Sequence, residues 1–231
     1  MQVICVHNLA KRYGQRTVLQ GIDLSVEQGE YVAILGANGS GKTTLIRAVA
    51  GLTLPDEGTV SFFGQSSSDR KVICSHLGVV HQHSALPEYV TVRELLSNER
   101  RLRGLDEATV DKAIDLAGLH GQPPKLIREL SEGTRRRVAV VRALLHDPAI
   151  LLLDEPTAGL DPLIRMEIWE HLLHVKRKGC SALIATNDLQ EAAQLCDRMF
   201  FLRSGCLYSA NGLHDAGSMA ELYKGYAALQ K

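Results

Sequence analysis

The sequence predicts an α/β fold built on a mostly parallel sheet, and three observations support this prediction. A glycine-rich loop at residues 36–44 stands between an apolar run and a helix-like run. The continuous apolar run 150–153 is typical of a strand buried on both faces of a parallel sheet. From residue 150 to residue 202, strand-like and helix-like segments alternate, as they do in βαβ units. In such sheets, ligands bind at the carboxyl ends of the strands.

The other elements follow from apolar periodicity and from Gly and Pro punctuation. Short strands before residue 36 predict an N-terminal antiparallel β region with a turn at 11–14. Between residues 84 and 146 the pattern becomes helical, which predicts a helical subdomain inserted into a core of residues 1–83 and 147–231, all within one domain. The expected strands are 3–6, 18–26, 32–35, 59–63, 77–80, 150–153, 181–186 and 199–202, and the expected helices are 91–103, 106–119, 131–146, 162–178, 189–196, 215–231 and one from the loop to Ala50.

Composition excludes several classes of protein. The chain has 231 residues, and its 26 Lys plus Arg balance 26 Asp plus Glu, so no overall field favours nucleic acid. Five widely spaced cysteines without a Cys-x-x-Cys pair are typical of a reducing compartment. No apolar run approaches the roughly 18 residues that a membrane-spanning helix needs. We therefore expect a cytoplasmic protein whose role at a membrane, if it has one, is peripheral.

The loop 36–44 carries the strongest chemical signal. It fits the spacing Gly-x-x-x-x-Gly-Lys-[Ser/Thr] and has the strand and helix that this motif needs as its context. Its backbone N–H groups and the helix dipole would bind phosphate, Lys42 would lie between the β- and γ-phosphates, and the Thr43 hydroxyl would ligate Mg²⁺. A chance glycine-rich turn is the alternative. The loop reads Gly36, Ala37, Asn38, Gly39, Ser40, Gly41, Lys42, Thr43 and Thr44.

Two acidic residues, Asp154 and Glu155, end the apolar run 150–153. Acids at the end of a buried strand are costly unless they face a cation or a polar site. We expect Asp154 to hold Mg²⁺ through water and Glu155 to orient or deprotonate the attacking water. A surface turn with two solvated acids is the alternative, and the nearby phosphate-loop motif makes it the weaker one.

These motifs, in this order, resemble the ATP-binding subunits of ABC transporters along essentially the whole chain. The segment from Arg135 to Pro148 is most similar to the ABC-2-type export class. The resemblance implies a RecA-like P-loop NTPase core that binds ATP and Mg²⁺ and hydrolyses ATP. It also implies separate transmembrane permease subunits, attachment to the inner face of the cell membrane, and a second ATPase subunit in a homodimer or heterodimer.

The same resemblance assigns roles to further residues. Tyr13 would stack on adenine, and Gln82 would contact Mg²⁺ and the attacking water. Asp161 would belong to the D-loop. The signature motif, at residues 130–134, would act in trans on the γ-phosphate held by the second subunit; its contacting residues are Ser131, Gly133 and Thr134.

Two positions depart from the family pattern. Asn187 stands where the family has its switch histidine, and the signature has Glu132 and Thr134 in place of a Gly and a Gln. Asn can donate one hydrogen bond to phosphate but cannot relay a proton, so we expect slow hydrolysis. A catalytically weakened regulatory subunit with an active partner is therefore an alternative. A soluble ABC protein of DNA repair or translation is disfavoured, since the chain holds neither coiled coils nor two ATP modules. The arginine run 135–137 predicts a solvated helix face.

Overall fold

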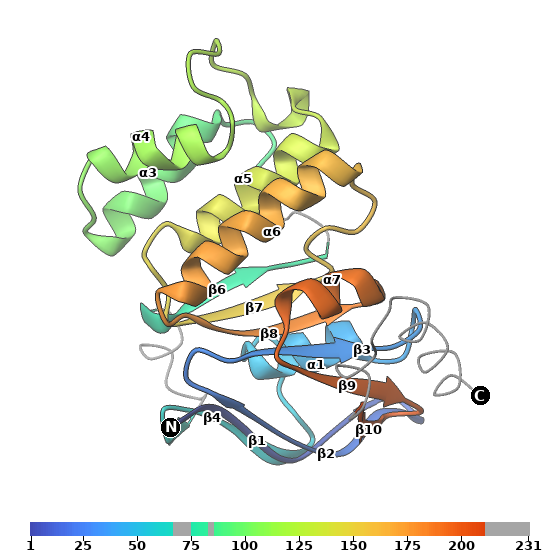
Figure 1. Ribbon diagram of the computed structural model, residues 1–231. Helices are drawn as coiled ribbons and strands as arrows, with labels where there is room; N and C mark the ends of the chain where they lie inside the picture. The colour runs from blue at the N-terminus through green and yellow to red at the C-terminus, as the bar shows by residue number, and fades with distance from the viewer. Residues whose placement is uncertain (67–74, 83–85, 211–231) are drawn as a thin grey trace.

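The computed structural model describes residues 1–66, 75–82 and 86–210, and its centre is a six-stranded sheet (Figure 1). The strand order is β10-β9-β3-β8-β7-β6, in which β10 runs antiparallel to β9 and the other neighbours are parallel. The predicted α/β fold with a mostly parallel sheet is thus confirmed. The strands are β3 (Tyr31–Leu35), β6 (Leu77–Val80), β7 (Ile150–Asp154), β8 (Ser181–Thr186), β9 (Arg198–Arg203) and β10 (Cys206–Ser209).

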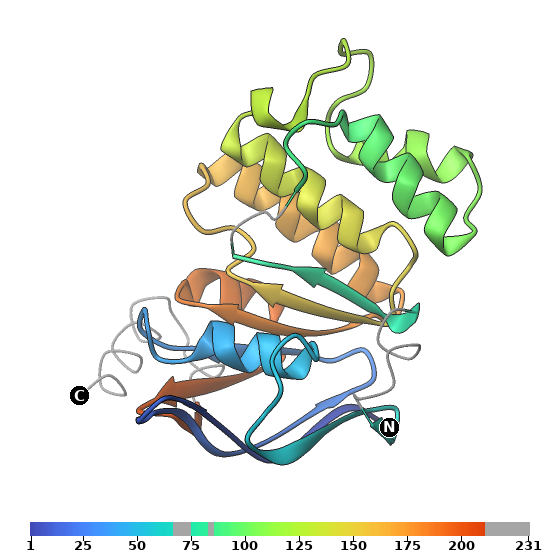
Figure 2. The same cartoon turned by 180° about the vertical axis from the view of Figure 1, so that it is seen from behind.

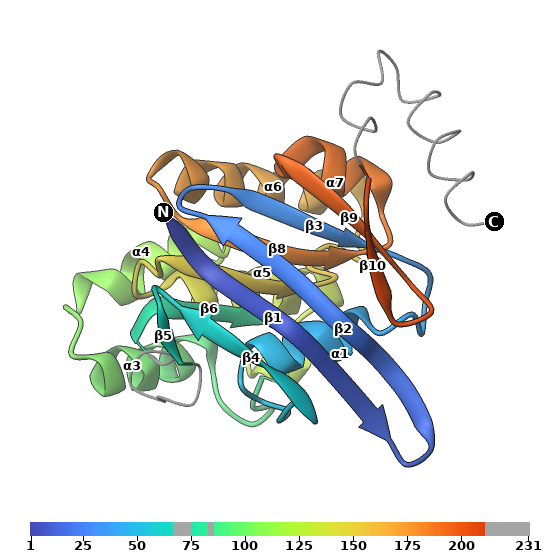
Figure 3. The ribbon, with the colours of Figure 1, turned by 90° about the horizontal axis from the view of Figure 1, so that it is seen from below.

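A second, antiparallel sheet contains the N-terminal strands, as predicted, in the order β2-β1-β4-β5. Figure 3 shows its long hairpin crossing the molecule. The predicted turn at 11–14 is wrong in its start, because Tyr13 still pairs with Arg16 across the hairpin, which leaves only two residues for the turn. The first of these, Gly14, has a φ of 60°, a value that glycine adopts readily. The strands are β1 (Gln2–Tyr13), β2 (Arg16–Glu27), β4 (Glu57–Phe62) and β5 (Gln65–Ser66).

The helices form layers around the central sheet. Helix α1 lies between the two sheets, whereas α5, α6 and α7 cover the opposite face of the six-stranded sheet (Figures 1 and 2). Helices α3 and α4 pack beyond α5, at one end of the molecule. The elements are α1 (Lys42–Val49), α3 (Val92–Arg103), α4 (Ala108–Leu116), the 3-10 turn η1 (Ile127–Glu129), α5 (Glu132–Leu144), α6 (Pro162–Arg177) and α7 (Leu189–Leu195).

Strand β7 explains how the sheet is buried on both faces. Ile150 and Leu152 belong to the core between the two sheets, and Leu151 and Leu153 belong to the core under the helices. Successive side chains of a strand point to opposite faces, so all four apolar residues are needed. All four are fully buried, which is why the strand appears in the sequence as an unbroken apolar run.

The helix boundaries have local causes. Helix α3 begins with a capping box between Thr91 and Glu94 and ends at Gly104, whose φ is 66°. The sequence did not predict the short elements β5, η1 and β10, which are too brief to show periodicity. The helix predicted at 215–231 lies outside the described residues. Within the described ranges, no helix has the length and apolar character needed to cross a membrane.

Candidate functional site

Four predicted site segments meet at one edge of the six-stranded sheet. The phosphate loop (residues 36–44) follows β3, Asn187 follows β8, Glu155 follows β7 and Gln82 lies two residues beyond β6. These four strands are adjacent and parallel, so their carboxyl ends lie side by side. Segments that are distant in sequence therefore form one site, as expected for parallel sheets.

The phosphate loop depends on two of its glycines. Gly41, immediately before α1, has a φ of 111°, a conformation that side chains rarely adopt. A Cβ on Gly36 would lie 2.7 Å from the carbonyl oxygen of Leu202. The first turn of α1 contains no acidic side chain, so its positive dipole end can act on an anion. The loop and helix together can bind phosphate.

Lys42 lies inside the loop and is only 5% exposed. Its Nζ donates hydrogen bonds to the carbonyls of Gly36 (2.8 Å) and Ala37 (3.2 Å). The same Nζ lies 3.5 Å from Oε1 of Glu155. Gln82 Nε2 donates to the other carboxylate oxygen of Glu155, at 3.3 Å. Glu155 therefore lies between an ammonium group and an amide.

Asp154 adds a second buried carboxylate that is 2% exposed. Burial raises the pKa of Asp154, and the negative charge of Glu155 raises it further. A hydrogen bond from the Thr43 hydroxyl lowers this pKa and so opposes the shift. Its Oδ1 has no hydrogen-bond partner among the described residues. An unpaired buried carboxylate oxygen calls for an explanation, and oxygen ligands of this kind suit Mg²⁺. The pair Asp154 and Thr43 can thus hold a hard divalent cation.

Glu155 has an unusual backbone. Its φ is 49°, in the left-handed region that non-glycine residues seldom occupy. Its N–H donates a 2.7 Å hydrogen bond to the carbonyl of Ala185 on the neighbouring strand β8, which holds this conformation in place. Backbone strain of this kind is concentrated at functional sites.

A cavity of about 400 Å³ is lined by parts of the phosphate loop, Gln82 and Glu155. Tyr13, at the end of β1, is 50% exposed and lies on its rim. Thr43, Gln82 and Glu155 line the interior together with the loop. The lining residues are Tyr13, Arg16, Val18, Asn38, Gly39, Gly41, Lys42, Thr43, Thr44, Gln82 and Glu155.

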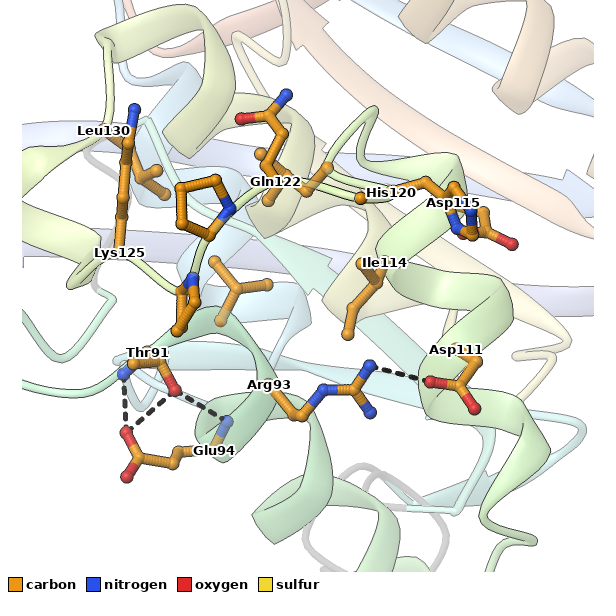
Figure 4. Close-up of a pocket in the computed structure, with 15 residues that line it drawn as sticks. Thr91, Arg93, Glu94, Asp111, Ile114, Asp115, His120, Gln122, Lys125 and Leu130 are labelled. Atoms are coloured by element: carbon orange, nitrogen blue, oxygen red, sulfur yellow. Dashed lines mark hydrogen bonds and ion pairs between the residues drawn. The ribbon is translucent and has the colours of Figure 1, made fainter.

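A larger cavity of about 620 Å³ lies elsewhere, between α3, α4 and the segment 119–125 (Figure 4). Several polar groups on its wall already have partners: Thr91 and Glu94 cap α3, and Arg93 pairs with Asp111 at 2.8 Å. None of the predicted site residues lines it. The smaller cavity is therefore the candidate site.

The signature residues do not line that cavity. Ser131 caps α5 by accepting a hydrogen bond from the N–H of Thr134 at 3.2 Å, and the two hydroxyls are 2.8 Å apart. Ser131 is exposed, whereas Gly133 is buried against α6. Asp161 caps α6. Within one chain, the signature and the phosphate loop are separate.

Sequence comparison decides the family. The profile of the ABC transporter family matches residues 19–158. The chain belongs to the ABC transporter family. This ABC transporter chain is 38% identical over 208 residues to the Nod factor export ATP-binding protein I of Ralstonia nicotianae. The match covers 88% of the chain and 65% of that relative, so the chain spans slightly less than two thirds of the relative's length.

Solved structures agree with the family assignment. The structure of an ATP-binding subunit of an ABC transporter is 27% identical and has a TM-score of 0.86, with coverage of 99% of this chain and 100% of that one. The dimeric structure of a bacterial ABC transporter cassette is 26% identical with a TM-score of 0.80, covering 88% and 96%. The predicted family resemblance and P-loop fold are both confirmed.

A second prediction about this ABC transporter chain is also wrong. The arginine run 135–137 does not form a solvated face, because Arg136 is 4% exposed. Its guanidinium donates hydrogen bonds to the carbonyls of His81 and Gln82. Helical spacing could have revealed this, because position 136 shares a face with Gly133 and Val140, both of which are buried.

The buried position of Glu191 was also not predicted: this acid on α7 is only 1% exposed. Its Oε1 accepts hydrogen bonds from the Thr157 hydroxyl (2.5 Å) and from Trp169 Nε1 (3.2 Å). Burial raises its pKa, and these hydrogen bonds oppose the shift. Glu191 thus ties α7 to α6 and to the segment just after Glu155. Acidic residues in short helices are ordinarily exposed, so nothing in the pattern predicts this position.

Proposed function

We propose that this chain binds ATP with Mg²⁺ in the 400 Å³ cavity and hydrolyses it to drive export through separate membrane subunits. The observation that carries the proposal is the placement of Glu155 between Lys42 and Gln82, beside the phosphate loop. A cation, a carboxylate base and an amide around one phosphate-sized loop suit phosphoryl transfer to water. The export-type relative supports the transport role.

Each residue has a defined task in this proposal. Lys42 and the backbone of residues 36–44 bind the phosphates, and Tyr13 stacks on the adenine ring. Glu155 accepts the proton of the attacking water, which Gln82 orients. Asp154, Thr43 and Gln82 would hold Mg²⁺. When bound, Mg²⁺ supplies positive charge to the phosphate oxygens.

A complete site would need two chains. The signature residues Ser131, Gly133 and Thr134 lie away from this chain's own cavity, and Ser131 is exposed at the start of α5. A helix N-terminus of this kind suits the γ-phosphate of a second subunit, with Asp161 nearby in the contact. The similar dimeric cassette supports this arrangement. The assembly would sit on the inner face of the membrane, with residues 84–146 as a helical subdomain on a core of residues 1–83 and 147–231.

A second candidate function is that of a catalytically weakened subunit with an active partner. It rests on Asn187, whose Nδ2 donates a 3.2 Å hydrogen bond to Oδ1 of Asn38 in the phosphate loop. The amide therefore reaches the phosphate site, but it has neither the charge nor the proton-transfer capacity of a histidine. Under this proposal, ATP binding persists and turnover is slow.

The test uses two variants and gel filtration. Glu155→Gln should keep ATP affinity and accumulate an ATP-bound dimer with Mg²⁺, since the base is lost but the phosphate contacts remain. Lys42→Ala should lose ATP affinity and stay monomeric. Equal ATP binding by the wild type and Lys42→Ala, or a Glu155→Gln chain that stays monomeric with ATP and Mg²⁺, would overturn the proposal.

A further inference from the structure

The side chain of Arg136 binds the backbone of the segment that contains Gln82. Its Nη1 donates a 2.7 Å hydrogen bond to the carbonyl of His81, and its Nη2 donates a 2.6 Å hydrogen bond to the carbonyl of Gln82. Two parallel contacts from one rigid guanidinium fix both the position and the orientation of the backbone they bind. The backbone immediately after β6 is thereby attached to helix α5.

Burying the charged guanidinium of Arg136 costs free energy, which a residue that only filled space would not require. Arg136 is 4% exposed, and its hydrogen bonds go to neutral carbonyls. Burial lowers its pKa, and four carboxylates oppose that shift through their charge; they belong to Glu132, Asp154, Glu155 and Glu191. A well-packed apolar side chain would usually give equal or greater stability at such a position. The arginine is better explained by what it holds.

The backbone that Arg136 binds belongs in part to Gln82, whose side chain contacts the proposed hydrolytic residues. The side chain of Gln82 donates to Oε2 of Glu155 at 3.3 Å, and Oε1 of Glu155 lies 3.5 Å from Lys42 Nζ. Arg136 therefore begins a continuous series of contacts from α5 to the phosphate loop. The same helix is capped by Ser131, five residues earlier. If the start of α5, where the signature residues lie, were displaced, Arg136 and the backbone of Gln82 that it binds would move as well.

We propose that Arg136 is a positioning residue that holds Gln82 against Glu155 and couples helix α5, which begins within the signature motif, to the hydrolytic site. The inference rests on the proposed function, because it concerns the same site. It predicts that a change at Arg136 lowers the rate of hydrolysis, and that this effect requires Gln82. A merely structural arginine would instead affect folding, or ATP affinity and turnover together.

The experiment compares single-turnover ATP hydrolysis with Mg²⁺, ATP affinity and urea unfolding in Arg136→Gln and Arg136→Lys. Arg135→Gln is the matched control, with the same charge change one position away on the same helix. Arg136→Gln should lose at least about tenfold in hydrolysis rate and keep ATP affinity within about threefold, because one hydrolytic group is misplaced. Arg136→Lys keeps the positive charge but loses the planar guanidinium that donates two hydrogen bonds. Its hydrolysis rate should lie between those of the wild type and Arg136→Gln. Arg135→Gln should match the wild type.

A double-mutant cycle with Gln82→Ala then identifies the route. If Arg136 acts through Gln82, adding Arg136→Gln to Gln82→Ala should change the rate by less than about twofold. Independent, multiplicative losses would overturn the inference, as would a wild-type rate in Arg136→Gln. If that variant fails to fold, the same cycle with Arg136→Lys decides. Absence of ATP turnover in the wild type would overturn the proposed function itself and the inference with it, whereas wild-type turnover unaffected by Arg136→Gln overturns the inference alone.

Discussion

The side-chain amide of Asn187 donates a 3.2 Å hydrogen bond to Oδ1 of Asn38 and so joins the loop after β8 to the phosphate loop. Both residues are exposed at the edge where the parallel strands end. Under the proposed function, Asn187 lies within reach of a phosphate held by the loop, but its amide does not titrate near neutral pH. We therefore propose that the site binds ATP but turns it over slowly.

Asp154→Asn should remove the effect of Mg²⁺ on ATP affinity. The variant keeps an oxygen acceptor for the Thr43 hydroxyl but loses the buried charge whose Oδ1 has no partner. ATP affinity measured with Mg²⁺ should fall at least about tenfold, whereas affinity in a chelator should stay unchanged. The free energy of unfolding without Mg²⁺ should not decrease, since a charge with a burial-raised pKa has been neutralised. An equal loss of affinity in both conditions would contradict the assignment of Asp154 to the metal.

Tyr13→Ala should weaken ATP binding about fivefold or more, because the aromatic ring at the cavity rim is removed. Tyr13→Phe keeps the ring and should bind like the wild type. Isothermal titration with ATP and Mg²⁺ checks both variants. If the Phe variant binds as weakly as the Ala variant, the hydroxyl rather than stacking explains the role of this residue.

Glu191→Leu should lower the free energy of unfolding by about 2–4 kcal/mol, because it leaves the buried donors on Thr157 and Trp169 without an acceptor. Glu191→Gln keeps an acceptor oxygen and should cost about half as much or less. Urea unfolding followed by fluorescence measures both. Equal losses would mean that the charge of the carboxylate, and not simply an acceptor oxygen, is what this side chain provides.

His146 should make stability pH-dependent below neutrality. Burial, together with the charge of Arg103, lowers its pKa to about 4, below the value of about 6.5 in an unfolded chain. The unfolded state therefore binds the proton more readily, and the contribution present above pH 6.5 is lost as the pH falls toward 4. Between pH 7.5 and pH 5 the wild type should lose about 1–2 kcal/mol more than His146→Gln. Parallel pH profiles of the two proteins in urea unfolding would contradict this prediction.

Much of this fold can be predicted because its local signals agree. The run 150–153 has to be apolar at every position, since β7 contacts two cores, and Thr91, Glu94 and Gly104 determine where α3 starts and stops. The phosphate loop is recognisable because its glycine spacing follows from backbone geometry.

Other features depend on tertiary structure, and the local pattern predicts them weakly or not at all. The end of β1 at Tyr13 is set by pairing with Arg16 across the hairpin. Arg136 and Glu191 are buried only because distant segments supply their partners. Charge in a sequence predicts exposure by default, and both residues are exceptions that require a partner 54 or 34 positions away.

The most direct test of this account compares steady-state ATP turnover, with Mg²⁺, of the wild type and Asn187→His. Because one donor at a site of developing charge is worth on the order of 10²–10³ in rate, the histidine variant should turn over at least about tenfold faster than the wild type at unchanged ATP affinity. No gain in the histidine variant, or a wild-type turnover already near the roughly 10 s⁻¹ of an ordinary enzyme, would contradict the claim that Asn187 slows hydrolysis.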